Sequence, residues 1–209
     1  MKASVLVFAK APVPGAVKTR LIPLIGADGA ARLQRQLTEH SLRIARDARI
    51  GPVELCCTPN REHAFFAECA VRYRMQLSDQ TGCDLGERMH NALAQACSEG
   101  RSAILIGSDC PSLTATDLGD AAAALASGYR AVFVPSTDGG YMLVGTTASD
   151  RRLFERIDWG SATVMAQTRE RLHSLGWLWQ ELPERWDVDR PEDYERMLRE
   201  GLLEVDARQ

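Results

Sequence analysis

The chain has 209 residues, 45% of them hydrophobic and 25% charged, which suits one globular domain over residues 1–209. Its formal net charge of −3 lacks the bulk positive charge that nonspecific nucleic-acid binding needs, so we expect no nucleic-acid partner. No apolar stretch approaches the roughly 18 residues that span a bilayer. Because the first residues also lack a signal-peptide pattern, we expect a cytoplasmic protein with no membrane span.

Apolar runs typical of buried strands alternate with amphipathic helical patterns along most of the chain. In chain order, strands are predicted at residues 3–9, 52–58, 102–107, 131–136, 141–145 and 177–182. Helices are predicted at residues 28–48, 85–98, 114–128, 161–175 and 191–201. This alternation favours an α/β fold with a mostly parallel central sheet, in which ligands gather at the carboxyl ends of the strands.

The segment FAKAPVPGAVKTRL follows the first predicted strand and is unusually rich in lysine. Only three of the 25 basic residues are lysines, and two of these lie in this segment, together with Arg20. A glycine lets the backbone approach an anion, and lysine carries a compact charge on a flexible stem that can follow a phosphoryl group. We interpret the segment as a phosphate-binding loop whose candidate nucleotide-binding residues are Ala9, Lys10, Gly15, Lys18 and Arg20.

Two familiar phosphate motifs are excluded for this loop. Lys18 lies three residues after Gly15, so the pattern is not GxxxxGK[ST], and GxGxxG is absent as well. The connection over residues 10–27 is long, and long ordered loops are usually functional. The alternative is a solvated basic loop with no ligand.

Acidic residues follow other predicted strands. Ser108 and Asp109 come directly after the strand at 102–107, where Ser108 is a further nucleotide-binding candidate and Asp109 a candidate ligand of Mg²⁺ or Mn²⁺. The alternative is that Asp109 only caps the following turn. Either Asp187 or Asp189 could complete the metal site, although Asp189 could instead cap the helix predicted at 191–201.

The stretch Asp138, Gly139, Gly140, Tyr141 lies between two predicted strands. Asp-Gly and Gly-Gly pairs favour a hairpin turn there. A second glycine beside a tyrosine would also let a ligand pass close to the backbone. Both interpretations stay open at this stage.

Six stretches together resemble a known family. They are FAKAPVPGAVKTRL, DLGERM, GSDCPSLT, DGGYMLVG, WGSATVMAQT and DVDRPEDY. They look like the DUF2064 proteins, also called rSAM/selenodomain-associated transferase 1, of the GT-A superfamily of nucleotide-diphospho-sugar transferases. A more distant likeness, to 2-phospho-L-lactate guanylyltransferase and the molybdenum cofactor nucleotidyltransferases, rests on the basic loop, the aspartate after a central strand and the acidic ending.

The resemblance implies a three-layer α/β/α sandwich that binds a nucleotide over its first half and an acceptor over its second. By position, Lys18 and Arg20 match residues that hold phosphates, and Asp109 and Asp189 match the two metal carboxylates. Residues 138–141 match the part that faces the acceptor. One departure concerns the metal site, where Asp109 is followed by Cys-Pro rather than by the x-Asp of many glycosyltransferases.

Three cations in one loop favour a nucleoside triphosphate over a nucleotide sugar as the donor. We therefore expect a metal-dependent enzyme that transfers a nucleotidyl group to a small hydroxyl- or phosphate-bearing acceptor and releases pyrophosphate, with Lys18, Arg20 and Asp109 as its catalytic residues. A glycosyltransferase that uses a nucleotide sugar is the alternative, and a nucleotide-binding module without turnover is a third possibility. Loop residues 80–84 are candidates for contacts to the base.

Overall fold

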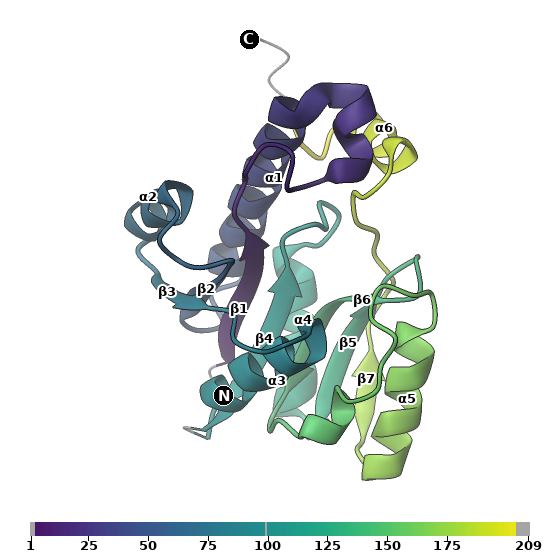
Figure 1. Ribbon diagram of the computed structural model, residues 1–209. Coiled ribbons are helices and arrows are strands. Elements are labelled where there is room, and N and C mark those ends of the chain that lie inside the picture. Colours follow the sequence, from purple (N-terminus) through teal and green to yellow (C-terminus); the bar gives the residue numbers. More distant parts are fainter. Residues whose placement is uncertain (1–2, 99, 204–209) are drawn as a thin grey trace.

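The computed structural model describes residues 3–98 and 100–203 and contains a seven-stranded sheet (Figure 1). The strand order is β3-β2-β1-β4-β6-β5-β7. β6 runs antiparallel to both of its neighbours and the other pairings are parallel, so the prediction of a mostly parallel sheet is confirmed. The strands are β1 Ala3–Lys10, β2 Val53–Thr58, β3 Gln76–Asp79, β4 Ser102–Gly107, β5 Ala131–Pro135, β6 Tyr141–Thr146 and β7 Trp179–Glu181.

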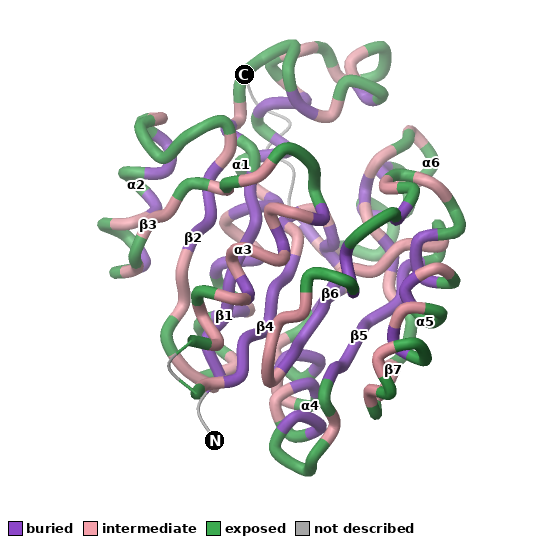
Figure 2. The backbone as a smooth tube through the Cα atoms, turned by 60° about the horizontal axis from the view of Figure 1, so that its bottom comes forward, coloured by how far each residue is buried: buried purple, intermediate pink, exposed green. Residues whose placement is uncertain are grey.

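Helices cover both faces of the sheet, because successive strand residues point to opposite sides. Val5 and Val7 of β1 join one core cluster, which includes residues of α1, α2 and α4. Leu6 and Phe8 join the other, with residues of α3 and α5. The result is the expected three-layer α/β/α sandwich, and Figure 2 shows its central strands buried and its helices exposed on their outer sides. The helices are α1 Ile22–Asp47, α2 Ala64–Tyr73, α3 Leu85–Cys97, α4 Ala115–Ala126, α5 Val164–Leu175 and α6 Pro191–Arg199.

A third, smaller core brings the C-terminal segment back to the beginning of the chain. Leu21, Leu33 and Leu37 pack there against Trp186, Val188, Tyr194 and Met197. Figure 1 accordingly shows α6 beside the N-terminal end of α1. This return places the acidic segment around residues 187–189 next to the loop that follows β1.

Two parts of the chain differ from the prediction. Residues 59–84, to which no element was assigned, contain α2 and the short edge strand β3. Helix α1 begins at Ile22 rather than at residue 28, and it is kinked at Gly26, whose φ of 72° is not helical. The loop after β1 is therefore shorter than expected, since the 3-10 helix η1 (Thr19–Leu21) starts directly after residue 18. Every other predicted element is present, with ends within three residues of the prediction.

The turn between β5 and β6 is a hairpin, which confirms the simpler interpretation of the Asp-Gly-Gly stretch. Ser136 donates its backbone N–H to the Gly140 carbonyl at 3.0 Å, and Met165 at the start of α5 donates to the Gly139 carbonyl at 2.8 Å. Gly139 has a φ of 91°, and a Cβ there would lie 2.1 Å from the Ala162 carbonyl oxygen. Only glycine fits this close approach of two backbones.

Replacing Gly139 by alanine should therefore destabilise the protein by about 2–4 kcal/mol, since it adds a backbone clash to an unfavourable φ. Gly160→Ala is the matched control, because Gly160 has a similar φ of 85° but no atom within 4 Å of its Cβ position. That control should lose only about 1 kcal/mol. Urea denaturation measures both values, and equal losses would mean that the contact with Ala162 is unimportant.

Candidate functional site

A cleft of about 580 Å³ opens at the carboxyl ends of β1 and β4. This is where parallel sheets place their ligands. The loop after β1, the end of β4, the start of β6 and the segment around residues 187–189 all contribute to its lining. The candidate residues that it brings together are Ala9, Lys10, Lys18, Arg20, Ser108, Asp109, Tyr141, Asp187 and Asp189.

Lys18 lies at the centre of this arrangement, and its side chain is only 5% exposed. Its ammonium group donates to the Val188 carbonyl at 2.6 Å and pairs with Asp109 Oδ1 at 3.0 Å. A buried cation is stable only when it is neutralised and hydrogen-bonded. One side chain thus connects the loop after β1, the loop after β4 and the C-terminal segment.

The other two cations of the loop are exposed and have different partners. Lys10 donates to the Ala16 carbonyl at 2.8 Å, so it stabilises the loop from within. Arg20 pairs with Asp189, and their side chains are 63% and 40% exposed. Such exposed pairs are weak, because water competes for both partners. Arg20 is therefore the cation most readily available to an incoming anion.

Backbone contacts hold the segment that carries the C-terminal aspartates against the loop after β4. Val188 donates its N–H to the Asp109 carbonyl at 3.0 Å. The Trp186 carbonyl accepts hydrogen bonds from the Ser112 hydroxyl at 3.0 Å and the Cys110 thiol at 3.1 Å. The position of the acidic segment is thus fixed on both sides of Asp187.

An ion pair between the half-buried Arg185 and the buried Asp117 anchors the same segment to helix α4. Asp117 accepts hydrogen bonds from Thr114 and also from the Arg185 guanidinium, at 2.7 and 3.1 Å. Burial by itself would raise the pKa of Asp117, but the bonds from Arg185 and Thr114 hold that pKa below its ordinary value. Asp117 therefore stays charged and clamps residue 185, two positions before Asp187.

Asp187 is a half-buried carboxylate in an acidic environment. Burial, followed by the negative charges of Asp138 and Asp109, raises the pKa of Asp187 to about 6, against the opposing charge of Lys18. The shift indicates that Asp187 and Asp109 are close enough to repel each other. A site that binds a cation is expected to hold carboxylates in this unfavourable way.

Asp189 does not cap the last helix, so the alternative interpretation of this residue does not hold. The N-cap of α6 is Arg190, and Asp193 Oδ2 accepts the backbone N–H groups of Arg190 at 2.8 Å and of Asp189 at 3.2 Å. A carboxylate in the first turn takes the capping role instead. The Asp189 side chain is consequently available to the cleft and to Arg20.

The carboxylates suit a metal ion that arrives with phosphates. Among the residues that the structure describes, no group of three His, Cys, Asp or Glu side chains is placed to hold a metal. Mg²⁺, however, is commonly bound by one or two carboxylates together with substrate phosphates and water. Asp109 Oδ1 is buried without a well-placed hydrogen-bond donor, and it is an oxygen ligand of the required kind. Asp109 and Asp187 are therefore the residues that could supply oxygen ligands to such an ion, and Asp189 lines the same cleft.

Tyr141 and Met142 contribute to the cleft from the second half of the chain. The Tyr141 ring packs edge-on against Phe133 and Trp159, with ring centroids 5.2 and 6.3 Å apart, and burial raises its pKa. The other predicted acceptor residues, Asp138, Gly139 and Gly140, form the adjoining turn and do not line the cleft. Gly15, in the loop after β1, does not line the cleft either.

Several lining residues were not predicted as site residues, among them Gln34, Thr58 and Arg88. Gln34 of α1 donates to the Ser108 hydroxyl at 3.2 Å, and Thr58 ends β2. Arg88 of α3 donates to the Gly82 carbonyl at 3.1 Å, and its signal in the sequence was the DLGERM stretch. Gln80, within the stretch proposed to contact the base, also lines the cleft and donates to the Cys56 carbonyl at 2.8 Å.

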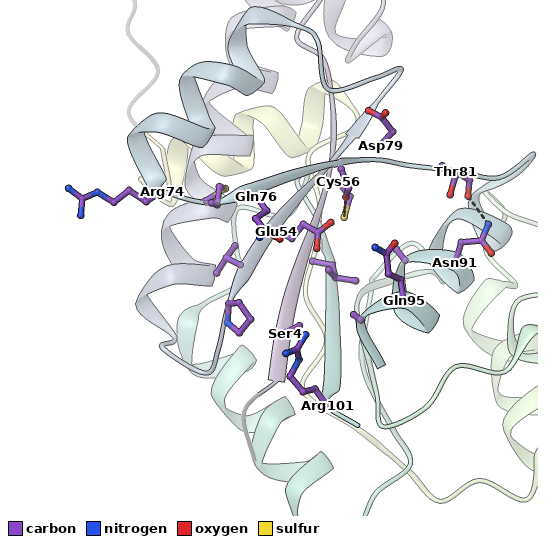
Figure 3. A pocket seen from close by; sticks show the side chains of 17 residues that line it. Ser4, Glu54, Cys56, Arg74, Gln76, Asp79, Thr81, Asn91, Gln95 and Arg101 are labelled. Atoms are coloured by element: carbon purple, nitrogen blue, oxygen red, sulfur yellow. Dashed lines mark hydrogen bonds between the residues drawn. The ribbon is translucent and has the colours of Figure 1, made fainter. Parts of the chain in front are cut away.

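A second cavity, of about 620 Å³, lies beside α3 over β2 and β3 (Figure 3). Polar side chains line much of it, and Figure 3 shows Glu54 of β2 and Gln95 of α3 on opposite sides of the space. It runs along the strands rather than across their carboxyl ends. Of the candidate residues named above it contains only Thr81, from the stretch proposed to contact the base, so the cleft at the strand ends is the better candidate site.

A model of the family DUF2064, described as "Uncharacterized protein conserved in bacteria", matches residues 41–161. No curated protein matches the chain significantly. Among solved structures, a candidate nucleotide-diphospho-sugar transferase from Desulfovibrio desulfuricans G20 is 32% identical, with a TM-score of 0.86 over 96% of this chain and 88% of that one.

Two more distant structures share the fold alone. A cytidylyltransferase from Leptospira borgpetersenii serovar Hardjo-bovis is 16% identical, with a TM-score of 0.59 over 94% of this chain and 85% of that one. CMP:2-keto-3-deoxy-manno-octonic acid synthetase, complexed with CTP, is 11% identical, with a TM-score of 0.59 over 97% of this chain and 100% of that one. No helix within residues 3–98 and 100–203 has the length and apolar character to cross a membrane.

Replacing Asp187 by asparagine should stabilise the protein by about 1–3 kcal/mol at pH 8. The carboxyl ionises less readily in the folded chain than in the unfolded one. The stability that comes from the more favourable protonated form in the folded chain is therefore complete below a pH of about 4, and it is lost as the pH rises through about 6.

Urea denaturation of the variant and the native chain at pH 4 and pH 8 measures this difference. Asp120→Asn, an exposed carboxylate on α4, is the control and should change little at either pH. An Asp187→Asn variant less stable than the native chain at pH 8 would contradict the repulsion described above.

Proposed function

We propose that this chain, a transferase that belongs to the DUF2064 family, moves a nucleotidyl group from a nucleoside triphosphate to a small acceptor. The observation that carries the proposal is the meeting of two sets of charges in one cleft. Lys10 at the end of β1, Lys18 of the following loop and Arg20 of η1 lie there beside three carboxylates, those of Asp109, Asp187 and Asp189. Cations beside carboxylates that can hold a metal suit a polyphosphate donor.

The cations would act on the phosphates in different ways. Arg20 is exposed and planar, so it would hold phosphate oxygens in a fixed orientation. Lys18 carries a compact charge that would follow the negative charge developing on the leaving pyrophosphate. Removing one contact of this kind typically costs on the order of 10²–10³ in rate.

Asp109, with Asp187 or Asp189, would hold Mg²⁺ or Mn²⁺, which would neutralise phosphate oxygens and orient the donor. The turn at residues 138–140 and Tyr141 would face the acceptor. An acceptor oxygen attacks the α-phosphorus, the bond between that phosphorus and the bridging oxygen breaks, and pyrophosphate leaves with the electron pair. A phosphate acceptor is already nucleophilic and needs no general base. The residues that line the cleft, within the described part of the chain, accordingly include no histidine.

A second candidate function is glycosyl transfer from a nucleotide sugar. It is favoured by the relative from Desulfovibrio desulfuricans, which is described as a candidate nucleotide-diphospho-sugar transferase and is 32% identical. The same cleft and carboxylates would serve, but a diphosphate leaving group needs fewer cations. The Cys-Pro that follows Asp109 also departs from the Asp-x-Asp of many glycosyltransferases.

A donor panel separates these functions. The protein is incubated with Mg²⁺ and each common nucleoside triphosphate or nucleotide sugar, and thermal stabilisation and pyrophosphate release are measured. We expect stabilisation by at least one triphosphate, and pyrophosphate release once a suitable acceptor is present. Stabilisation by nucleotide sugars but by no triphosphate would favour glycosyl transfer. Binding without turnover across a broad acceptor panel would indicate a nucleotide-binding module.

Arg20→Ala should weaken binding of the stabilising triphosphate about tenfold or more, because a charged hydrogen bond to phosphate is lost. Its melting temperature should hardly change, since the pair with Asp189 is exposed. Arg32→Ala, an exposed arginine of α1, is the matched control and should keep the native affinity. Equal triphosphate affinities in both variants, measured by calorimetry, would remove Arg20 from the proposed site.

A further inference from the structure

We infer that Lys18 is a built-in counter-ion that closes the carboxylate site to free divalent cations until a polyphosphate draws its ammonium group away. This inference rests on the proposed function, because it assigns an order of binding to the same site. It concerns what Lys18 does before any donor is present, whereas the proposed function concerns what Lys18 does afterwards.

The burial of Lys18 is the first observation. A lysine that only awaited a phosphate would be expected to extend into solvent, as hydrated ammonium groups do. Lys18 is instead 5% exposed and contacts Asp109 Oδ1 and the Val188 carbonyl, at 3.0 and 2.6 Å. Lys10, at the end of β1, is instead exposed and donates to the Ala16 carbonyl of the loop. The loop thus places one particular cation on the carboxylate that would hold a metal.

The cost of separating this pair decides the order of binding. A free divalent cation that took Asp109 would leave the Lys18 ammonium buried without its counter-ion, which is strongly unfavourable. Electrostatic repulsion between the divalent cation and the Lys18 ammonium group would add to that cost. A metal ion that arrives on a polyphosphate brings a new anion for Lys18, so the ammonium exchanges one negative partner for another. The site should therefore accept the metal–polyphosphate complex and reject the metal alone.

The backbone around Lys18 is suited to such an exchange. Lys18 has a left-handed conformation, with a φ of 45°, which is unfavourable for a residue with a side chain and needs to be held by its contacts. The preceding residues 13–16 are exposed, and no atom lies within 4 Å of a Cβ placed on Gly15. Residues 13–16 can therefore shift with little loss of packing, while the buried Val17 holds the loop next to Lys18.

The test measures binding of Mn²⁺ to the full chain at pH 8 by equilibrium dialysis with paramagnetic detection. The native protein should bind free Mn²⁺ weakly. Lys18→Gln, which can still donate to the Val188 carbonyl but carries no charge, should bind it at least about tenfold more tightly. Lys10 carries the same charge but contacts the Ala16 carbonyl rather than Asp109. The Mn²⁺ affinity of the Lys10→Gln variant should therefore stay within about twofold of the native value.

Further variants make the result specific to Asp109. Adding Asp109→Asn to Lys18→Gln should abolish the gain in Mn²⁺ affinity. Lys18→Met repeats the measurement without a hydrogen-bond donor, and circular dichroism verifies that each variant is folded. Tight binding of free Mn²⁺ by the native chain, or equal affinities in the Lys18→Gln and Lys10→Gln variants, would overturn the inference.

A second arm uses inorganic tripolyphosphate with Mn²⁺ as a probe that carries no base or sugar. The native chain should retain Mn²⁺ in its presence, because the phosphates replace Asp109 as the partner of Lys18. If tripolyphosphate fails to bind while the contrast between the Lys18 and Lys10 variants holds, the proposed polyphosphate site is wrong and the closure of the carboxylates by Lys18 stands. If tripolyphosphate binds but the contrast is missing, the proposed function survives and the inference fails.

Discussion

The buried ammonium group of Lys18 is the contact on which the cleft depends. It has two partners at once, the Asp109 carboxylate from the loop after β4, with which it forms an ion pair, and the Val188 carbonyl from the C-terminal segment, which accepts its hydrogen bond. Because a buried cation cannot be left without partners, these three parts of the chain have to meet. The Asp117–Arg185 pair and the bond from Val188 to the Asp109 carbonyl hold the same segments from outside the cleft.

The sheet supplies the frame for this meeting. β1 and β4 are adjacent, parallel and buried on both faces, so their carboxyl ends deliver the basic loop and Asp109 to one edge. The third core packs α6 and Val188 against Leu21 and α1, which brings Asp187 and Asp189 to the same edge. The site carries repulsion as well, since the pKa of Asp187 is raised to about 6. Repulsion of this kind is a common cost of placing functional groups together.

Much of the fold was predictable because it rests on local periodicity. The two-faced burial of β1 and the amphipathic pattern of α3 are properties of short windows. The strand β3, within the unassigned residues 59–84, was not predicted, since it is four residues long at the sheet edge and its one aliphatic residue, Leu77, makes no recognisable pattern. The start of α1 was misplaced because Gly26 interrupts the helical conformation only locally. The role of Asp189 was ambiguous, because its spacing to Pro191 suits both a helix cap and a free carboxylate.

By itself, the sequence determined the alternation of strands and helices, the cluster of cations after the first strand and the carboxylates that could join it. Only the tertiary structure decided which of these groups meet and which face solvent. Lys18 and Arg20 are two positions apart, yet one is buried against Asp109 and the other is exposed beside Asp189. Their partners in the C-terminal segment, Val188 and Asp189, lie 170 and 169 residues away along the chain. Contacts at that separation depend on how the chain returns to its first loop, and no local pattern of residues encodes that return.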